Sequence, residues 1–271
     1  MTSTDEPWTG GPWGDRAHAV LCPNPSPMTL EGTNTWVLLE PGSTEAVVVD
    51  PGPLQEEHLR AVLAHVAGRG ARVALTLLTH GHPDHAESAE RWAELTAAPV
   101  RGAGRGQDLT DGEVVGAGGL ELRVVTTPGH TADSFCFLVP ADRVVLTGDT
   151  VLGRGTTVVA HPDGDLTSYL ASLQRLRDLA ACGEATSIAP GHGPVAADAA
   201  GVLDRYLTHR HQRLDQVREA VTQVRGSEAP RGSDLADRVV ELVYADTPRE
   251  VWPAARLSVL AQLAYLGEPV G

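Results

Sequence analysis

Three histidines and one aspartate fall within residues 80–85, shortly after the largely apolar run at residues 73–78. An apolar run of this length, bounded by polar residues, is typical of a strand that is buried on both faces. Neutral imidazole nitrogens and carboxylate oxygens are ligands that suit Zn²⁺ and similar divalent ions. The plain alternative is a solvated loop that happens to be rich in histidine. We interpret the segment as a metal site at the end of a buried strand.

Three other strand-like runs end in the same way. The runs at residues 120–125, 144–146 and 186–189 are each followed within a few positions by a turn and a candidate ligand. The ligand-type residues that follow the four runs are His80, His130, Asp149 and His192. Loops held by the ends of a rigid sheet are where catalytic side chains collect. Four such strand ends therefore predict one shared cleft.

Length and composition indicate a globular protein with a large core. The chain has 271 residues, of which 42% are hydrophobic. Its apolar runs are all shorter than the roughly 20 residues that a membrane-spanning helix needs. The N-terminal segment has neither a basic start nor an apolar core, so it does not resemble a signal peptide, and a cytoplasmic protein without a membrane partner is expected. Cys22, Cys136 and Cys182 lie far apart without a CxxC pair, and none is a candidate ligand or nucleophile.

The charge balance argues against extended nucleic-acid binding. The formal net charge is −14, and all 21 basic residues are arginines. Such a balance repels phosphate backbones at long range, although a local arginine patch stays possible. Five arginines in the C-terminal region alternate with acidic residues, a pattern typical of a solvated helix face. They are Arg205, Arg210, Arg213, Arg218 and Arg225.

The order of the predicted elements indicates an α/β (α+β) fold with a helical tail. Strands are predicted at residues 19–22, 35–39, 46–49, 73–78, 120–125, 135–139, 144–146 and 186–189. Helices are predicted at residues 54–66, 83–96, 165–179, 198–224, 234–244 and 248–266, with a loop or short hairpin at 102–119. We therefore expect a lead-in at residues 1–18, a catalytic domain at 19–196 and a small helical domain at 197–271.

The candidate ligands together resemble a known family. The pattern His80-x-His82-x-Asp84-His85, followed by Pro-Gly-His130-Thr, Thr-Gly-Asp149 and Pro-Gly-His192-Gly, resembles the metallo-β-lactamase superfamily over roughly residues 19–195. The stretches at residues 32–35, 152–157 and 164–170, with residues 254–259 in the tail, resemble the lactamase-β-like-2 type of hydrolase. The resemblance implies a four-layer αββα sandwich with a C-terminal winged-helix-like domain.

The resemblance also implies a role for each ligand. His80, His82 and His130 would hold a first ion, and Asp84, His85 and His192 a second, with Asp149 bridging both. Asp84 and Asp149 are the candidate catalytic residues. Asp50, at the end of an earlier strand, would support the ligands from behind and fix the orientation of an imidazole. Arg154 is a candidate substrate contact, and so is His161, for which a plain loop histidine is the alternative.

Seven donors exceed what one zinc ion needs, since catalytic zinc usually takes three protein ligands and keeps one position open. Two ions about 3.5–4 Å apart, sharing Asp149 and a water, would use the full set. The sequence therefore predicts a hydrolase with two Zn²⁺ ions per chain and a bridging hydroxide as nucleophile. Other divalent metals, such as Fe or Mn, also fit these ligands.

The ligand set does not select the bond that is cleaved. An ester, a thioester or a phosphodiester would suit it, in a small molecule or a short oligonucleotide. β-Lactamase activity is not expected, because antibiotic-cleaving relatives usually lack an aspartate at the position of Asp149. The alternatives are an iron persulfide dioxygenase with one metal ion, an endoribonuclease that cleaves single-stranded RNA, and a metal-stabilised scaffold without catalysis. A monomer and a homodimer both fit the apolar stripe of the tail.

Overall fold

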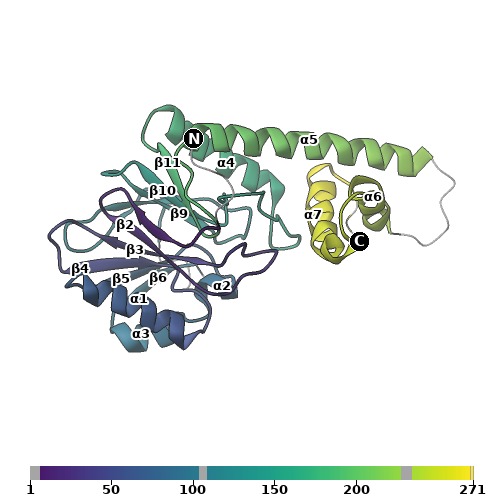
Figure 1. Cartoon of the computed structure of the whole chain (residues 1–271). Helices are drawn as coiled ribbons and strands as arrows, with labels where there is room; N and C mark the ends of the chain where they lie inside the picture. The colour runs from purple at the N-terminus through teal and green to yellow at the C-terminus, as the bar shows by residue number, and fades with distance from the viewer. Residues whose placement is uncertain (1–6, 104–108, 227–233, 269, 271) are drawn as a thin grey trace.

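The computed structural model describes residues 7–103, 109–226, 234–268 and 270. Two β-sheets pack against each other, and helices cover the outer face of each sheet (Figure 1). This arrangement confirms the predicted αββα layers. A long helix, α5 (Ala199–Gly226), runs from this body to the C-terminal helices, which pack along its second half (Figure 1).

The first sheet has six strands in the order β1-β2-β3-β4-β5-β6. Its strands are β1 (Gly11–Trp13), β2 (Ala17–Leu21), β3 (Asn34–Leu39), β4 (Glu45–Val49), β5 (Arg72–Leu78) and β6 (Val100–Gly102). The pairs β4–β5 and β5–β6 are parallel, and the other pairs are antiparallel. Helices α1 (Glu56–Gly68) and α3 (Ala89–Thr96) cover the outer face of this sheet.

The second sheet has five strands in the order β11-β10-β9-β8-β7. Its strands are β7 (Val114–Val115), β8 (Leu122–Thr126), β9 (Phe135–Val139), β10 (Val144–Gly148) and β11 (Ser187–Pro190). β10 and β11 are parallel, and β9 is antiparallel to both β8 and β10. As a result, β8, β10 and β11 all end at the same edge of the sheet. Helix α4 (Leu166–Ala181) and the first part of α5 cover its outer face.

The central strands are buried at nearly every position, because both faces of each sheet are covered. Trp36 and Phe137 point into the core between the two sheets. The next residue along each strand points the other way, so Val37 packs under α1 and α3, and Leu138 packs under α4. Cys136 lies on this second outer face and is fully buried.

Two predicted features differ from the structure. Part of the expected lead-in forms β1, because Trp8 and Trp13 pack their rings against the core between the sheets. The helix predicted at residues 83–96 is two helices, α2 (Pro83–Ala86) and α3, and it breaks at Ser88. There the Ser88 backbone N–H and the Ser88 hydroxyl both donate to the carbonyl of Gly52, at 3.2 and 2.8 Å, instead of continuing the helical pattern.

The C-terminal region is helical in the part that the structure describes. It contains α6 (Leu235–Val243), a 3-10 turn at Arg249–Val251 and α7 (Trp252–Tyr265). These helices share a small apolar core with the second half of α5, in which Val217, Val240 and Val259 are fully or almost fully buried. The break predicted at residues 227–233 lies outside the described residues, and the proposed domain boundaries stay a prediction. None of the helices described in the chain is long and apolar enough to cross a membrane.

Candidate metal centre

The structure brings all seven candidate ligands together at the strand ends. Four of them follow β5, and the others follow β8, β10 and β11. They form two groups, and within each group the potential ligand atoms all lie within 4.8 Å of one another. The first group is His80, His82 and His130, and the second is Asp84, His85, Asp149 and His192. The four strand ends therefore bring their ligand-type side chains to one place, as the sequence predicts.

The first group consists of three imidazoles whose nitrogens converge. His82 presents Nδ1 at 3.0 Å from Nε2 of His80 and at 3.1 Å from Nε2 of His130. His80 and His130 are buried, and His82 is half-buried. Three nitrogens that face one point match the number of protein ligands that a catalytic zinc ion usually takes.

The second group adds carboxylates to two imidazoles. Nε2 of His192 lies 3.2 Å from Nε2 of His85 and 3.1 Å from Oδ2 of Asp84. Oδ1 of Asp149 lies 3.4 Å from Nε2 of both His85 and His192. The other oxygen of Asp149, Oδ2, lies 3.8 Å from Nε2 of His130 in the first group. Asp149 thus has one oxygen toward each group.

The far nitrogens of three histidines are held by oxygen acceptors. Nδ1 of His130 lies 2.8 Å from the Val158 carbonyl, and Nδ1 of His192 lies 3.1 Å from the Gly32 carbonyl. Nδ1 of His85 lies 2.9 Å from the carboxylate of Asp50. Carbonyl and carboxylate oxygens only accept, so each Nδ1 carries a proton and donates. The Nε2 lone pairs of the neutral rings then face the cluster, as metal ligation requires.

Asp50 supports both groups from behind. It is 1% exposed, and its backbone is left-handed with φ 55°. Besides His85, its carboxylate accepts from the backbone N–H of Thr79 at 2.8 Å and from the Thr79 hydroxyl at 2.7 Å. The oxygen of that hydroxyl lies 3.0 Å from Nδ1 of His80 and accepts a hydrogen bond from it. Asp50 therefore orients His85 directly and His80 through Thr79. The role of Thr79 was not predicted from the sequence, where the only sign of it is its position next to His80.

A second set of hydrogen bonds fixes the loop that carries His192. The Asn34 side-chain amide donates to the carbonyls of Pro190 and Gly193, at 3.0 and 2.9 Å. Gly191 packs against the centre itself, since a Cβ there would lie 2.6 Å from Oδ1 of Asp149. Only glycine fits at this position. Asn34 belongs to the stretch at residues 32–35 that carried part of the family resemblance, and its role is to hold this loop.

The two groups differ in electrostatics. Burial lowers the pKa of His80 and His130, which keeps these rings neutral. Burial also opposes protonation of His85 and His192, but the negative charge of Asp149 outweighs it. As a result, the pKa of His85 is raised well above its ordinary value, and that of His192 is raised to about 9. The carboxylates of this group therefore favour positive charge at these two rings.

These features fit divalent cations. Oδ1 of Asp149 is buried and has no hydrogen-bond partner. A buried oxygen without a partner is costly, and a bound cation would satisfy it. A metal ion in the second group would also replace the protons on His85 and His192. The donor set of imidazoles and carboxylates is the set that suits zinc.

The sequence of this chain is similar to those of known proteins. Residues 28–106 and 100–192 match the family model described as the metallo-beta-lactamase superfamily. A relative from Caenorhabditis elegans named beta-lactamase-like protein 2 homolog is 33% identical over 91% of this chain and 81% of its own length. The chain belongs to the metallo-beta-lactamase superfamily. Residues 236–268 match the model of the beta-lactamase associated winged helix domain, so the metallo-beta-lactamase domain is followed by a winged-helix domain, as expected.

A second relative and a solved structure are also similar to most of this chain. A relative from Aspergillus chevalieri named atrochrysone carboxyl ACP thioesterase is 33% identical over 87% of this chain and 75% of its own length. A solved beta-lactamase domain protein from Burkholderia ambifaria superposes with a TM-score of 0.72 at 22% identity, covering 98% of this chain and 90% of its own. This last likeness shows that the fold extends through the C-terminal helices.

The two predicted substrate contacts lie in different surroundings. Arg154 lines a small pocket of about 240 Å³, and its guanidinium pairs with Glu31. Its neighbour Gly153 donates to the His192 carbonyl at 2.9 Å, so this loop adjoins the metallo-beta-lactamase centre. The backbone N–H of His161 donates to the carbonyl of Leu257 in α7 at 3.3 Å. No hydrogen bond or ion pair among the described residues joins the His161 side chain to the cluster.

Proposed function

We propose that this chain is a metal-dependent hydrolase that cleaves thioesters with two zinc ions. The observation that carries the proposal is the place of Asp149, which directs one oxygen to each of two groups of ligands. A single ion would leave one group unused, since catalytic zinc usually takes three protein ligands. Two ions sharing one carboxylate use the whole set.

The proposed roles follow from the contacts of each residue. The first ion would be held by His80, His82 and His130 and the second by Asp84, His85 and His192, with Asp149 placed to serve both groups. Such a pair of ions supplies water that is acidic enough to attack near neutral pH and draws electrons from the substrate carbonyl. Asp50 keeps the imidazoles in the ligating orientation. Asp84, whose side chain is 28% exposed, faces solvent and passes a proton from the attacking water to the departing thiolate.

A thioester is the substrate class that the observations favour. The attack of water forms a carbon–oxygen bond, and the carbon–sulfur bond breaks to give an acid and a thiol. The relative from Aspergillus chevalieri carries the name of a thioesterase. The formal net charge of −14 opposes binding of an RNA strand. We therefore propose a small thioester as substrate, a cytoplasmic location, and a monomer or homodimer without an extended nucleic-acid surface.

A comparison of substrates tests this proposal. Zinc-loaded protein is incubated separately with an acetyl thioester, bis(p-nitrophenyl) phosphate and a short single-stranded RNA. We expect thioester hydrolysis, measured as released thiol, and no cleavage of the two phosphodiesters. Asp84→Ala serves as the control and should abolish the release of thiol. Cleavage of RNA without thioester turnover would contradict the proposal and favour the nuclease alternative.

A further inference from the structure

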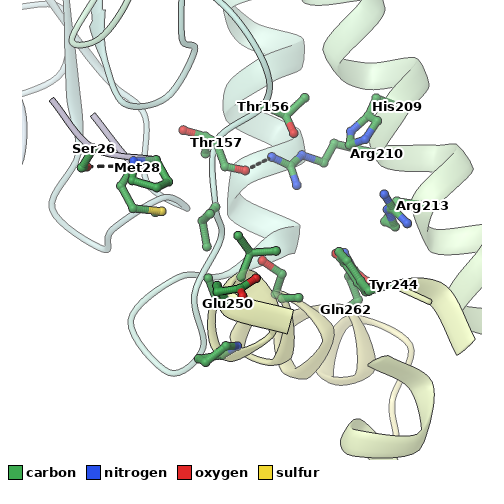
Figure 2. Close-up of a pocket in the computed structure, with 17 residues that line it drawn as sticks. Ser26, Met28, Thr156, Thr157, His209, Arg210, Arg213, Tyr244, Glu250 and Gln262 are labelled. Carbon is green, nitrogen blue, oxygen red and sulfur yellow. Dashed lines mark hydrogen bonds between the residues drawn. The ribbon is translucent and has the colours of Figure 1, made fainter. Parts of the chain in front are cut away.

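A large pocket lies between the metallo-beta-lactamase domain and the C-terminal helices. It has a volume of about 590 Å³, which is in the range of pockets that hold small organic ligands. Its walls come from residues 26–28 and 156–158 of the first domain, from α5, and from the region of α6 and α7 (Figure 2). Most of the lining is apolar and includes Met28, Val158 and Val251.

One wall of this pocket forms hydrogen bonds to two of the candidate metal ligands. The carbonyl of Val158 accepts the hydrogen bond from Nδ1 of His130. The hydroxyl of Thr157 donates to the backbone carbonyl of Asp149. Residues 156–158 thus line the pocket while they support one ligand from each group. A molecule in the pocket would lie against the segment that orients these ligands.

Two arginines in the pocket have no acidic partner. Arg210 is 4% exposed; it donates to the Thr157 carbonyl and stacks over Tyr169 at 4.9 Å. Arg213 donates to Gln216 and stacks over Tyr244 at 4.8 Å. Within the described ranges, neither guanidinium forms a salt bridge, although the exposed Glu250 also lines the pocket. Arg210 is buried, whereas Arg213 is half-buried. A buried cation without a counter-charge is costly, so an acceptor oxygen beside Arg210 would be stabilising.

Unpartnered polar atoms also collect around this pocket. Six buried side-chain polar atoms in the described part of the chain lack a hydrogen-bond partner, and three of them belong to residues that line it. These three are Nδ1 of His209, Nε of Arg210 and Oε1 of Gln262. Gln262 is 3% exposed, and rotation of its terminal amide is a low-cost motion. Buried polar groups normally have partners, so this concentration indicates a ligand that supplies them.

We propose that this pocket binds the acyl half of the thioester substrate, and that the acyl group has an apolar body carrying oxygen atoms. A hydroxyl of the acyl group accepts hydrogen bonds from the arginines Arg210 and Arg213 through its oxygen and donates its hydrogen to Gln262. The pocket is assigned to the acyl half because its lining is mostly apolar, whereas the carrier arm of a thioester is rich in polar amide groups. This inference rests on the proposed hydrolysis of thioesters and names the class of acyl group that the site selects.

Binding to metal-free protein is the first test. The probe is 3-hydroxy-2-naphthoate, an aromatic acid with one hydroxyl, and its binding is measured by calorimetry. We expect the wild type to bind it and Gln262→Leu to bind it about tenfold more weakly, which corresponds to the loss of one hydrogen bond. Arg213→Gln should weaken binding in the same direction. Gln223→Leu, at an exposed position on α5, is the matched control and should bind like the wild type.

Kinetics with zinc-loaded protein form the second test. Acetyl and 3-hydroxy-2-naphthoyl thioesters are compared on two carriers, N-acetylcysteamine and pantetheine. Gln262→Leu should raise KM about tenfold for the naphthoyl thioesters on both carriers and should change KM less for the acetyl thioesters, which carry no hydroxyl to donate to Gln262. An effect that follows the carrier and not the acyl group would overturn the inference.

The two tests separate this inference from the proposed function. Failure to hydrolyse both the acetyl and the naphthoyl thioesters, on either carrier, refutes the hydrolase proposal. Naphthoate binding of equal strength in wild type, Gln262→Leu and Arg213→Gln overturns the pocket assignment, whether or not thioesters are hydrolysed. Thermal midpoints of the variants within a few degrees of the wild type would show that the folded state is retained.

Discussion

Replacing Asp149 with alanine is expected to lower thioester turnover by about three orders of magnitude or more, as the loss of a central catalytic group commonly does. One oxygen of Asp149 lies 3.4 Å from Nε2 of His85 and His192, and the other lies 3.8 Å from Nε2 of His130. The substitution removes a donor from both groups at once. The measurements are kcat/KM for an acetyl thioester and the zinc content of the purified variant.

The control for this experiment is Asp246→Ala, at an exposed position in the C-terminal region. It should retain the turnover and zinc content of the wild type. Asp149→Ala should lose bound zinc as well as turnover, because its carboxylate contacts both groups. Wild-type turnover in Asp149→Ala would show that hydrolysis does not depend on a bridging carboxylate.

Replacing Asp50 with asparagine is expected to weaken zinc binding roughly 10- to 100-fold. This is the usual loss of affinity when a residue that hydrogen-bonds to a metal ligand is replaced. Asparagine is chosen because it tolerates the left-handed backbone found at this position, φ 55°. Its amide replaces a charged acceptor that serves His85 directly and His80 through Thr79. Competition with a chromogenic chelator measures the affinity.

The zinc affinities of three variants, compared with one another, show whether Asp50 acts through the imidazoles. Thr79→Val removes only the link to His80, so its zinc affinity should fall less than that of Asp50→Asn. Asp246→Asn should have no effect, since its side chain is exposed. Zinc affinity in Asp50→Asn equal to that of the wild type would contradict the supporting role of Asp50.

The candidate ligands could be predicted because strand periodicity and ligand type are both local features of the sequence. β5 is apolar at nearly every position, and the ligands begin two residues after it. The oxygens that fix the histidine rings could not be predicted in the same way. Two of them are backbone carbonyls, of Gly32 and Val158, whose positions depend on how distant loops fold against the strand ends.

Arg210 shows a correctable error in the prediction from sequence. The arginines of the long C-terminal helix were interpreted as a solvated face, and Arg218 is indeed exposed and pairs with Asp215. Arg210 is instead 4% exposed. Its position explains the difference, because it lies four residues after Tyr206 and four before Leu214, on the buried stripe of α5. Helical spacing, and not composition alone, would have placed it inside.

The pocket between the domains could not be predicted from the sequence. Its polar residues come from α5 and α7, and Arg210 and Gln262 are brought together only by the packing of the C-terminal helices on the first domain. Gln262 belongs to no recognisable motif, and the sequence pattern of its helix indicates only that the helix packs against others. The same limit applies to β1, which depends on the burial of Trp8 and Trp13 far from their sequence neighbours.

Metal analysis of purified protein, together with thioester turnover of the same sample, tests the two-ion centre most directly. Two groups of ligands that share Asp149 predict about two zinc ions per chain and thiol release that disappears when a chelator removes them. Restoring zinc should restore turnover. A single iron ion per chain, with oxygen consumed in the presence of a persulfide, would contradict the two-zinc hydrolase and favour the dioxygenase alternative.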